Sequence, residues 1–239
     1  MATVYLQALI SGLLIGGVFS LISVGLTLTF GVMKIKNFGH GDFLIIGMYF
    51  AFFCYTLLGI DPYIAAAMGV PLFFGIGWVM QKFLIRPVLY APETIKILVT
   101  VGISLCIQNI AVFFFSPDFQ TVQVAYGSYT IEFFGARISL SRLAATGLAI
   151  VIVIALYQFL MHSRTGRAIR ACAEDGDGAR AVGIDIDRIY MIALGISTVC
   201  VCLAGAMMTP FFYISPTVGL SFTLTAFVVV VLGGLGNLK

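Results

Sequence analysis

Seven long runs of apolar residues, almost free of charged side chains, limit what this chain can fold into. A transmembrane helix needs about 20 mostly apolar residues, and soluble domains carry about 25% charged residues. Here 10% of the residues are charged, 61% are hydrophobic, and the mean hydropathy is +1.10. We therefore predict an all-α polytopic membrane protein of about seven transmembrane helices, with residues 1–239 forming a single domain. The predicted spans are residues 4–33, 43–60, 63–80, 97–115, 143–161, 190–212 and 220–235.

Positively charged residues are unevenly distributed between the loops that join these runs. If the spans alternate across the membrane, only Arg137 and Arg142 lie on one side, and the other 11 of the 13 Lys and Arg residues lie on the opposite side. Because basic loops favour the cytoplasm, the pattern predicts an N-terminus outside the cell. The predicted cytoplasmic residues are Lys34, Lys36, Lys82, Arg86, Lys96, Arg164, Arg167, Arg170, Arg180, Arg188 and Lys239.

The predicted extracytoplasmic loop, residues 116–142, has a different pattern. Residues 121–126 and 129–134 alternate in polarity around Gly127-Ser128, which indicates a β-hairpin. Such a hairpin would cover the helix ends as a lid, or offer a landing surface to an extracytoplasmic partner.

Motifs for catalysis, metal binding and ATP binding are missing from the sequence. No Asp, Glu, Lys or Arg lies inside a predicted span away from its ends, which weakens a proton-driven carrier or an intramembrane hydrolase. The five cysteines form no C-x-x-C, and neither histidine belongs to a metal motif. We expect no catalytic residue, no metal site and no cofactor, so that any pumping would need energy from a partner.

Polar and small residues mark three positions within the apolar sequence. Gly12 and Gly16 form a G-x-x-x-G in the first span, which predicts a close contact between helices. In the fourth span, Thr100, Ser104 and Gln108 recur at four-residue spacing on one helical face, with Asn109 adjacent. These four polar residues would either bond neighbouring helices or line a weakly polar path. An uncharged path predicts that the chain without partners has no measurable affinity for an amino acid.

The segment NFGHGD after the first span also allows two interpretations. It would form a structured turn, in which Asn37 and Asp42 bond the backbone and the glycines adopt positive φ. Alternatively, Asn37, His40 and Asp42 would form a polar gate, since histidine titrates near physiological pH.

The loop over residues 162–189 holds a large share of the charged residues. Residues 165–173 have the pattern of an amphipathic helix, which Gly176 and Gly178 interrupt. Asp177 would then cap a second short helix over residues 178–182. Gly183 suits the end of that second helix.

This charged loop is either an ordinary solvated loop or a docking element. Docking is favoured because several of its apolar residues have no evident partner in the chain, so another protein would have to cover them. These residues are Ile169, Ala179, Val182 and Ile184.

Several motifs resemble the LivH-type branched-chain amino acid permeases of bacterial ABC importers. The segments GLTLTFGV (25–32), IKNFGHGD (35–42) and GMY (47–49) are similar to the family signature, and VLGGLG (231–236) is similar to its late V-x-G-G-x-G. DGARAVG (177–183) is similar to the E-A-A-x-x-x-G loop of ABC permeases, although Asp177 replaces Glu and Gly178 replaces the first Ala. Family members continue beyond the last motif, so a chain ending at Lys239 is expected to be a fragment or a naturally short form.

The resemblance implies a permease subunit in the bacterial inner membrane that carries branched-chain or related hydrophobic amino acids. It also implies cytoplasmic ABC ATPase subunits, a second permease subunit and an extracytoplasmic substrate-binding protein as partners, with ATP hydrolysed by the ATPases. A channel or facilitator for a small neutral solute such as urea or an amide is the alternative. The implied docking residues for the ATPase are Arg167, Arg170, Glu174, Asp177, Ala179, Arg180 and Gly183.

Overall fold

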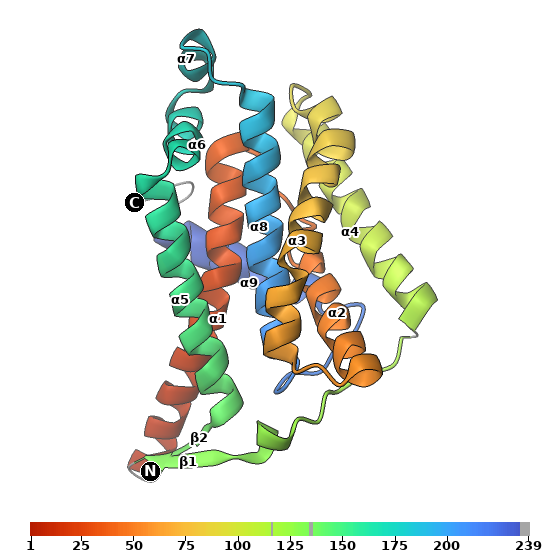
Figure 1. Ribbon diagram of the computed structural model, residues 1–239, viewed down its shortest axis with the longest axis vertical. Helices are drawn as coiled ribbons and strands as arrows, with labels where there is room; N and C mark the ends of the chain where they lie inside the picture. Colours follow the sequence, from red (N-terminus) through yellow and green to blue (C-terminus); the bar gives the residue numbers. More distant parts are fainter. Residues whose placement is uncertain (116, 134–135, 235–239) are drawn as a thin grey trace.

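The computed structural model describes residues 1–239 except 116, 134–135 and 235–239, and it is a bundle of long helices (Figure 1). Every predicted apolar run forms a helix, which confirms the helical membrane fold. Among the described residues, five helices are long and apolar enough to cross a membrane, and α2 and α9 are shorter. The helices of the bundle are α1 (Ala2–Met33), α2 (Asp42–Leu58), α3 (Pro62–Met80), α4 (Glu93–Phe115), α5 (Leu140–His162), α8 (Ile186–Met208) and α9 (Gly219–Gly233).

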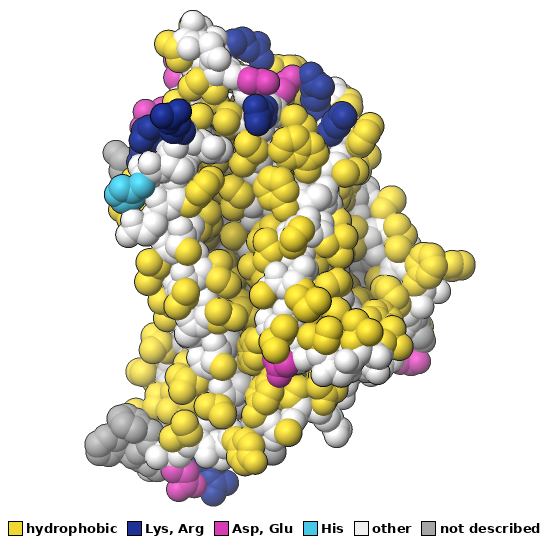
Figure 2. Space-filling view, viewed as in Figure 1, with side chains coloured by type: hydrophobic (Ala, Val, Ile, Leu, Met, Phe, Trp, Pro, Cys, Tyr) yellow, Lys and Arg dark blue, Asp and Glu magenta, His cyan; other side chains and the backbone are white. Residues whose placement is uncertain are grey.

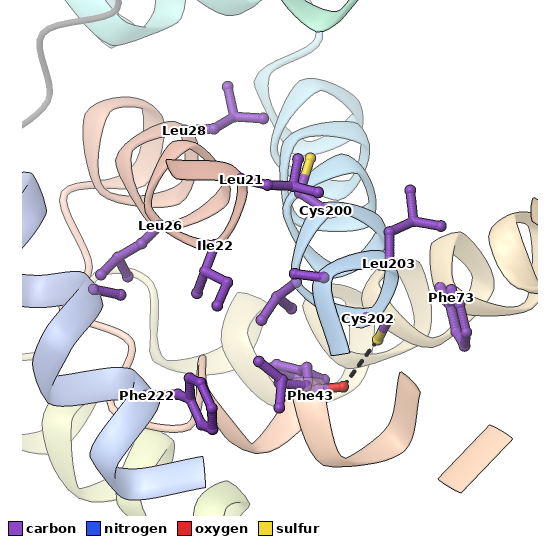
Figure 3. Packing of buried hydrophobic residues seen from close by; sticks show 14 of the residues in the cluster. Leu21, Ile22, Leu26, Leu28, Phe43, Phe73, Cys200, Cys202, Leu203 and Phe222 are labelled. Carbon is purple, nitrogen blue, oxygen red and sulfur yellow. Dashed lines mark hydrogen bonds between the residues drawn. The ribbon is translucent and has the colours of Figure 1, made fainter. Parts of the chain in front are cut away.

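Helix α8 lies at the centre of the bundle, between α1 and α3 (Figure 1). Of its most apolar 18-residue window, 78% is buried, which is far more than for any other span. Figure 3 shows Cys200, Cys202 and Leu203 of α8 facing side chains from the surrounding helices. The Sγ of Cys202 donates to the carbonyl oxygen of Phe43 at 3.0 Å, so α2 lies against α8 almost backbone to backbone.

Glycines make this close approach of α2 and α8 possible. A Cβ at Gly47 would lie 2.0 Å from the carbonyl oxygen of Cys202, and one at Gly205 would lie 2.2 Å from that of Leu44. Gly12 and Gly16 make no close helix contact within the described chain, because a Cβ at either would meet no described atom within 4 Å. Small residues permit a helix contact, but they do not identify the helix that makes it.

The charged loop forms two short helices, α6 (Arg164–Glu174) and α7 (Gly176–Ala181), at one end of the bundle (Figure 1). The break between them is at Asp175, which ends α6 and accepts a hydrogen bond from the backbone N–H of Asp177. The prediction that Asp177 caps the second helix is therefore wrong, and the preceding aspartate does so. Gly183 has φ +86°, a conformation that suits glycine, and it ends this segment as predicted.

The opposite end of the bundle carries a two-stranded antiparallel sheet, β1 (Thr130–Phe133) and β2 (Ala136–Ser139). The predicted pairing is wrong. The strand that begins near Tyr129 pairs with the segment after it, and Gly127 and Ser128 lie in the 3-10 turn η3 (Ala125–Ser128). The connection at 134–135, the C-terminal end of the last predicted span and Lys239 lie outside the described residues.

The chain between α3 and α4 changes its helical form rather than ending abruptly. Helix α3 continues through a π-helical turn, η1 (Gln81–Ile85), and a 3-10 turn, η2 (Arg86–Val88). Proline at position 87 is compatible with the first turn of such a segment because its missing N–H needs no partner there. This tightened end places Tyr90 beside the α6–α7 segment.

Candidate functional site

The segment between α1 and α2, residues 34–41, folds back into the bundle. Helix α1 ends at Met33, and Lys34 adopts a left-handed conformation with φ 54° that reverses the chain. Further on, the Nε2 of His40 lies 3.0 Å from the carbonyl oxygen of Ile22. Since Ile22 precedes Met33 by 11 positions, and a helix rises 1.5 Å per residue, this contact lies roughly 16 Å from the end of α1. Helix α2 therefore begins well inside the bundle, beside the middle of α1.

Side chains from α4 and α9 satisfy the irregular backbone of this segment. The N–H of Phe38 donates to the hydroxyl of Thr100 at 3.3 Å, and that hydroxyl lies 3.3 Å from the carbonyl of Lys36. The N–H of Gly41 donates to the hydroxyl of Thr223 at 2.9 Å. Non-helical backbone is tolerated at this depth only where protein or a water-filled cavity supplies such partners.

The glycines of this segment serve close packing rather than unusual torsion angles. Neither Gly39 nor Gly41 has positive φ, contrary to prediction. Instead, a Cβ at Gly41 would lie 2.2 Å from the carbonyl oxygen of Gly219, and one at Gly39 would lie 3.0 Å from that of Thr100. The segment can therefore lie in contact with α4 and α9 at once.

Asp42 is the centre of a polar cluster inside the bundle. Its side chain is fully buried, and its Oδ1 accepts a hydrogen bond from the Nε2 of Gln108 at 2.9 Å. The same amide group lies 3.2 Å from the hydroxyl of Ser104. The second carboxylate oxygen, Oδ2, has no hydrogen-bond partner among the described residues. The structure thus unites part of the predicted turn with three of the predicted path residues, Thr100, Ser104 and Gln108.

Two sequence-based expectations need correction here. An ionisable side chain does lie inside the bundle, because Asp42 is carried there by the returning segment. Asn109 does not belong to the cluster, since it is exposed and donates to the carbonyl of Leu105 in its own helix at 2.7 Å.

Asn37 and His40 both bond backbone groups. The Oδ1 of Asn37 accepts from the N–H of Gly39 at 3.1 Å, and its carbonyl accepts from the N–H of His40 at 3.3 Å. The ring of His40 is buried against α1. The Asp42 side chain behaves differently from those of Asn37 and His40. It accepts a hydrogen bond from a side chain of α4 rather than bonding the backbone of the turn.

In the α6–α7 segment, several predicted docking residues contact the chain itself. Arg167 donates to the carbonyl of His162 at 3.4 Å, and Arg170 lies against Met161. Both arginines therefore satisfy carbonyl groups at the C-terminal end of α5, where a positive charge is favourable. Arg180 donates to the hydroxyl of Tyr90 at 2.9 Å.

The apolar residues of this segment are less exposed than predicted. Ile169 and Ala179 are buried by the chain itself, and Ile184 is half-buried. Of these four residues, Val182 is the exposed one, at 78%. Glu174, Asp177 and Gly183 are exposed as well.

Further contacts tie the same end of the bundle together. Arg86 forms an ion pair with Asp187, and Lys36 forms one with Glu93 at 2.7 Å. The second pair joins the start of α4 to the segment that leads to Asp42. Sequence reasoning missed Tyr90 and Glu93, because neither belongs to a motif and their partners are distant in sequence.

Comparisons with known proteins agree with this description. Residues 8–239 match the family described as "Branched-chain amino acid transport system / permease component". The chain is 29% identical to the high-affinity branched-chain amino acid transport system permease protein LivH of Escherichia coli K12, over 98% of this chain and 80% of that protein. It is 28% identical to the corresponding protein BraD of Pseudomonas aeruginosa, with the same coverage, and 25% identical to a probable LivH of Methanocaldococcus jannaschii, over 92% and 71%. No solved structure matches the chain.

Proposed function

Since this chain belongs to the family of permease components of branched-chain amino acid transport systems, we propose that it is the membrane-spanning subunit of an ATP-driven importer. Its partners are cytoplasmic ABC ATPase subunits, a second permease subunit and an extracytoplasmic substrate-binding protein. The cargo is a branched-chain or related hydrophobic amino acid. The chain provides the path and the contact with the ATPase, and ATP is hydrolysed by the partner.

The distribution of charge supports an orientation with the α6–α7 segment in the cytoplasm. Figure 2 shows Lys and Arg side chains gathered over that end of the bundle, and few at the opposite end. Loops rich in Lys and Arg stay on the cytoplasmic side during insertion. In the proposed orientation the N-terminus and residues 116–142 lie outside the cell.

The exposed side of α7 and the turn after it carries the proposed contact with the ATPase. Val182 is an apolar side chain that is 78% exposed, and the same α6–α7 segment carries the exposed charged residues Glu174, Asp177 and Arg180. An apolar contact with a charged rim is typical of a protein interface. Arg167 and Arg170 hold this segment against the C-terminal end of α5 through hydrogen bonds to its carbonyl groups.

Contacts between α7 and the bundle give a route for coupling. Arg180 of α7 bonds Tyr90, which lies just before α4, and Glu93 at the start of α4 pairs with Lys36. Lys36 belongs to the segment that ends at Asp42. In our proposal, a displacement of α7 by the ATPase is transmitted through these contacts to the polar cluster.

Reconstitution tests this function against the facilitator alternative. Vesicles that contain the chain with its ATPase, second permease and binding protein should accumulate leucine only when ATP is present. Vesicles that contain the chain alone should show no uptake, because nothing then drives the transport cycle. Uptake by the chain alone, without ATP, would instead identify a facilitator.

The proposed orientation can be measured with a cysteine introduced at Val182. Cys172 is unsuitable as a natural reporter, because it is buried and burial raises the pKa of its thiol, which leaves little reactive thiolate. In a variant whose exposed Cys106 is replaced by Ala, Val182→Cys should react with a membrane-impermeant maleimide in inside-out vesicles. It should stay unlabelled in intact spheroplasts. Tyr129→Cys, at the other end and 64% exposed, should give the opposite result, and reversal of the two patterns would invert the orientation.

A further inference from the structure

A cavity of about 240 Å³ lies between α1, α5, α9 and the turn that follows α8. Sites for drug-sized ligands have volumes of about 300–1,000 Å³ and mostly apolar walls with a few polar groups, so this cavity suits a smaller molecule. Its described walls contain one charged side chain and two hydroxyl groups, and the rest are apolar. The lining residues are Ile15, Phe19, Arg142, Met208, Phe211, Phe212, Ser221, Phe222 and Thr225.

The cavity lies towards the end of the bundle that carries β1 and β2. Arg142 is the third residue of α5, and Thr146, one turn further on, donates to the carbonyl of Leu14 in α1 at 2.7 Å. Phe211 and Phe212 belong to the turn directly after α8. In the proposed orientation this end faces the outside of the cell. The cavity is therefore near the side on which a substrate-binding protein would release its cargo.

The charge of Arg142 is unpaired within the described part of the chain. Its side chain forms no ion pair and donates no hydrogen bond to a described residue, and its Cζ lies 5.8 Å from the ring centroid of Phe211. Arg137, the other basic side chain at this end, pairs with Glu132 at 3.0 Å. The Nε of Arg142 is buried without a partner, so the donors it offers to a ligand are those of its two terminal nitrogens.

The two hydroxyl groups of the cavity are acceptors for a ligand. Ser221 and Thr225 are four positions apart, so they share one face of α9. The Oγ of Ser221 donates to the carbonyl of Val218 at 2.7 Å, and the Oγ1 of Thr225 donates to the carbonyl of Ser221 at 2.9 Å. Since the single proton of each hydroxyl is used within its own helix, each oxygen can still accept a hydrogen bond. An ammonium group is the matching donor.

We propose that this cavity binds the transported amino acid on the outer side of the permease, with the guanidinium of Arg142 holding its carboxylate. The ammonium group donates to the hydroxyl oxygens of Ser221 and Thr225, and the apolar walls surround the aliphatic side chain. The inference rests on the proposed function and adds to it a binding site in this chain. A guanidinium and a carboxylate form a strong, charge-assisted pair, and an ionisable side chain inside a membrane bundle commonly marks a substrate pathway.

The helix that contacts the amino acid in this proposal also holds the start of α2. Phe222 of α9 lies between Phe19 and Phe212, with a centroid distance of 5.4 Å to each ring. The next residue, Thr223, accepts the hydrogen bond from the N–H of Gly41 at 2.9 Å. A bound amino acid would therefore bear on the same helix that fixes the segment leading to Asp42.

This site changes one expectation drawn from the sequence. A path with uncharged walls predicts no affinity for an amino acid in the absence of partners. An unpaired guanidinium in a mostly apolar cavity predicts weak binding that depends on the carboxylate. Leucine should bind better than glycine, because a branched side chain buries more apolar area. It should also bind better than aspartate, whose second carboxylate would lose its water without gaining a cation.

Photo-crosslinking tests the site in the complex of permease and ATPase subunits, without the binding protein, so that competitors act on the permease alone. Photo-leucine keeps the carboxylate and ammonium groups of leucine; light expels N₂ from its diazirine, and the carbene inserts into a neighbouring C–H bond. We expect adducts within residues 208–212 or 221–225, located by mass spectrometry. They should fall at least tenfold with excess leucine and little with excess isopentylamine, which is leucine without its carboxylate.

Three results would overturn the proposal. The first is a set of adducts that excess leucine does not reduce, or that lie only on other segments. The second is equal competition by isopentylamine, which would show that the carboxylate is not recognised. The third is a co-purified lipid that occupies the cavity and excludes the probe.

The two arginines at this end of the bundle provide a matched pair of variants. Arg142→Gln removes the charge in the cavity and should reduce the leucine-sensitive adducts at least tenfold, whereas Arg142→Lys keeps a cation there and should retain part of them. Arg137→Gln is the control, since Arg137 is exposed, pairs with Glu132 and does not line the cavity. It should leave the labelling unchanged.

Filling the cavity gives a second, independent pair of variants on α9. Ser221→Trp places a large side chain in the cavity and should reduce the leucine-sensitive adducts at least tenfold. Leu220→Trp is the control, because Leu220 is 51% exposed and does not line the cavity. The labelling of the unsubstituted chain decides about the site even if a variant fails to assemble.

Leucine uptake by vesicles that contain the complete assembly separates the site from the function. Uptake driven by ATP together with no leucine-sensitive adduct at the cavity would overturn the site and leave the proposed function standing. No ATP-driven uptake from a complete assembly would count against the function itself.

Discussion

Replacing Val182 with Arg should abolish the stimulation of ATP hydrolysis by the substrate-loaded binding protein in the assembled transporter. Val182 is 78% exposed, so the substitution leaves the chain's own packing unchanged. At the proposed contact with the ATPase, however, the guanidinium would be buried without a partner, which costs several kcal/mol. Because 1.4 kcal/mol is a factor of ten in an equilibrium constant, we expect the stimulated rate to fall at least tenfold, to the basal rate.

Val182→Ala is the control for this experiment, since it removes apolar area but introduces no charge. It should keep most of the stimulation. Size-exclusion chromatography would show whether the Arg variant still inserts and folds, and phosphate release measures the ATPase rate. Full stimulation in a folded Val182→Arg transporter would show that this turn is not the coupling contact. Ala179→Arg is a poorer choice, because Ala179 is buried by the chain itself and its loss would disturb α7 directly.

Replacing Gly47 with Val should prevent the chain from folding. The new Cβ would lie 2.0 Å from the carbonyl oxygen of Cys202, and this contact is with backbone that cannot rotate away. Helices α2 and α8 would have to separate, which costs more than the roughly 1–3 kcal/mol typical of an over-packed core. We expect no monodisperse protein after detergent extraction, measured by fluorescence-detected size-exclusion chromatography.

Gly12→Val provides the matched control, because a Cβ at Gly12 meets no described atom within 4 Å. It is the same substitution in a helix of similar hydropathy, so it should yield normal amounts of folded protein. Equal yields from the two variants would mean that α2 and α8 are not in close contact. Gly47→Ala should give an intermediate yield, since even its single methyl group meets the carbonyl.

The apolar spans could be predicted from the sequence because their signal is local. A helix in a membrane satisfies its own backbone hydrogen bonds, so an uncharged run of sufficient length is enough to indicate it. The α6–α7 segment was predictable for a similar reason, since an amphipathic pattern and glycine breaks are local features. Its cap was misassigned by two residues, because Asp175 and Asp177 are equally good caps in sequence and differ only in backbone geometry.

The position of Asp42 could not be predicted, because it depends on contacts distant in sequence. The segment before it looks like a short basic loop, and nothing in its composition indicates that it re-enters the bundle. Its backbone is accepted there because Thr100 and Thr223 supply hydroxyl groups, 62 and 182 positions away from the groups that they bond. The helix partner of a glycine is equally non-local, which is why Gly12 and Gly16 suggested a contact that Gly47 and Gly205 make instead.

The returning segment has a consequence for the order in which the protein is made. Residues 34–41 leave the ribosome long before Thr223, whose hydroxyl accepts a hydrogen bond from the N–H of Gly41. Until α9 is synthesised, the start of α2 lacks this partner and cannot hold its final place beside α4. During biogenesis, therefore, the long helices assemble first, and the segment at residues 34–41 reaches its final position only when α9 packs against it. In nascent chains arrested before Thr223, the start of α2 should not be packed in its final position. We expect it to be accessible to chaperones and proteases of the membrane.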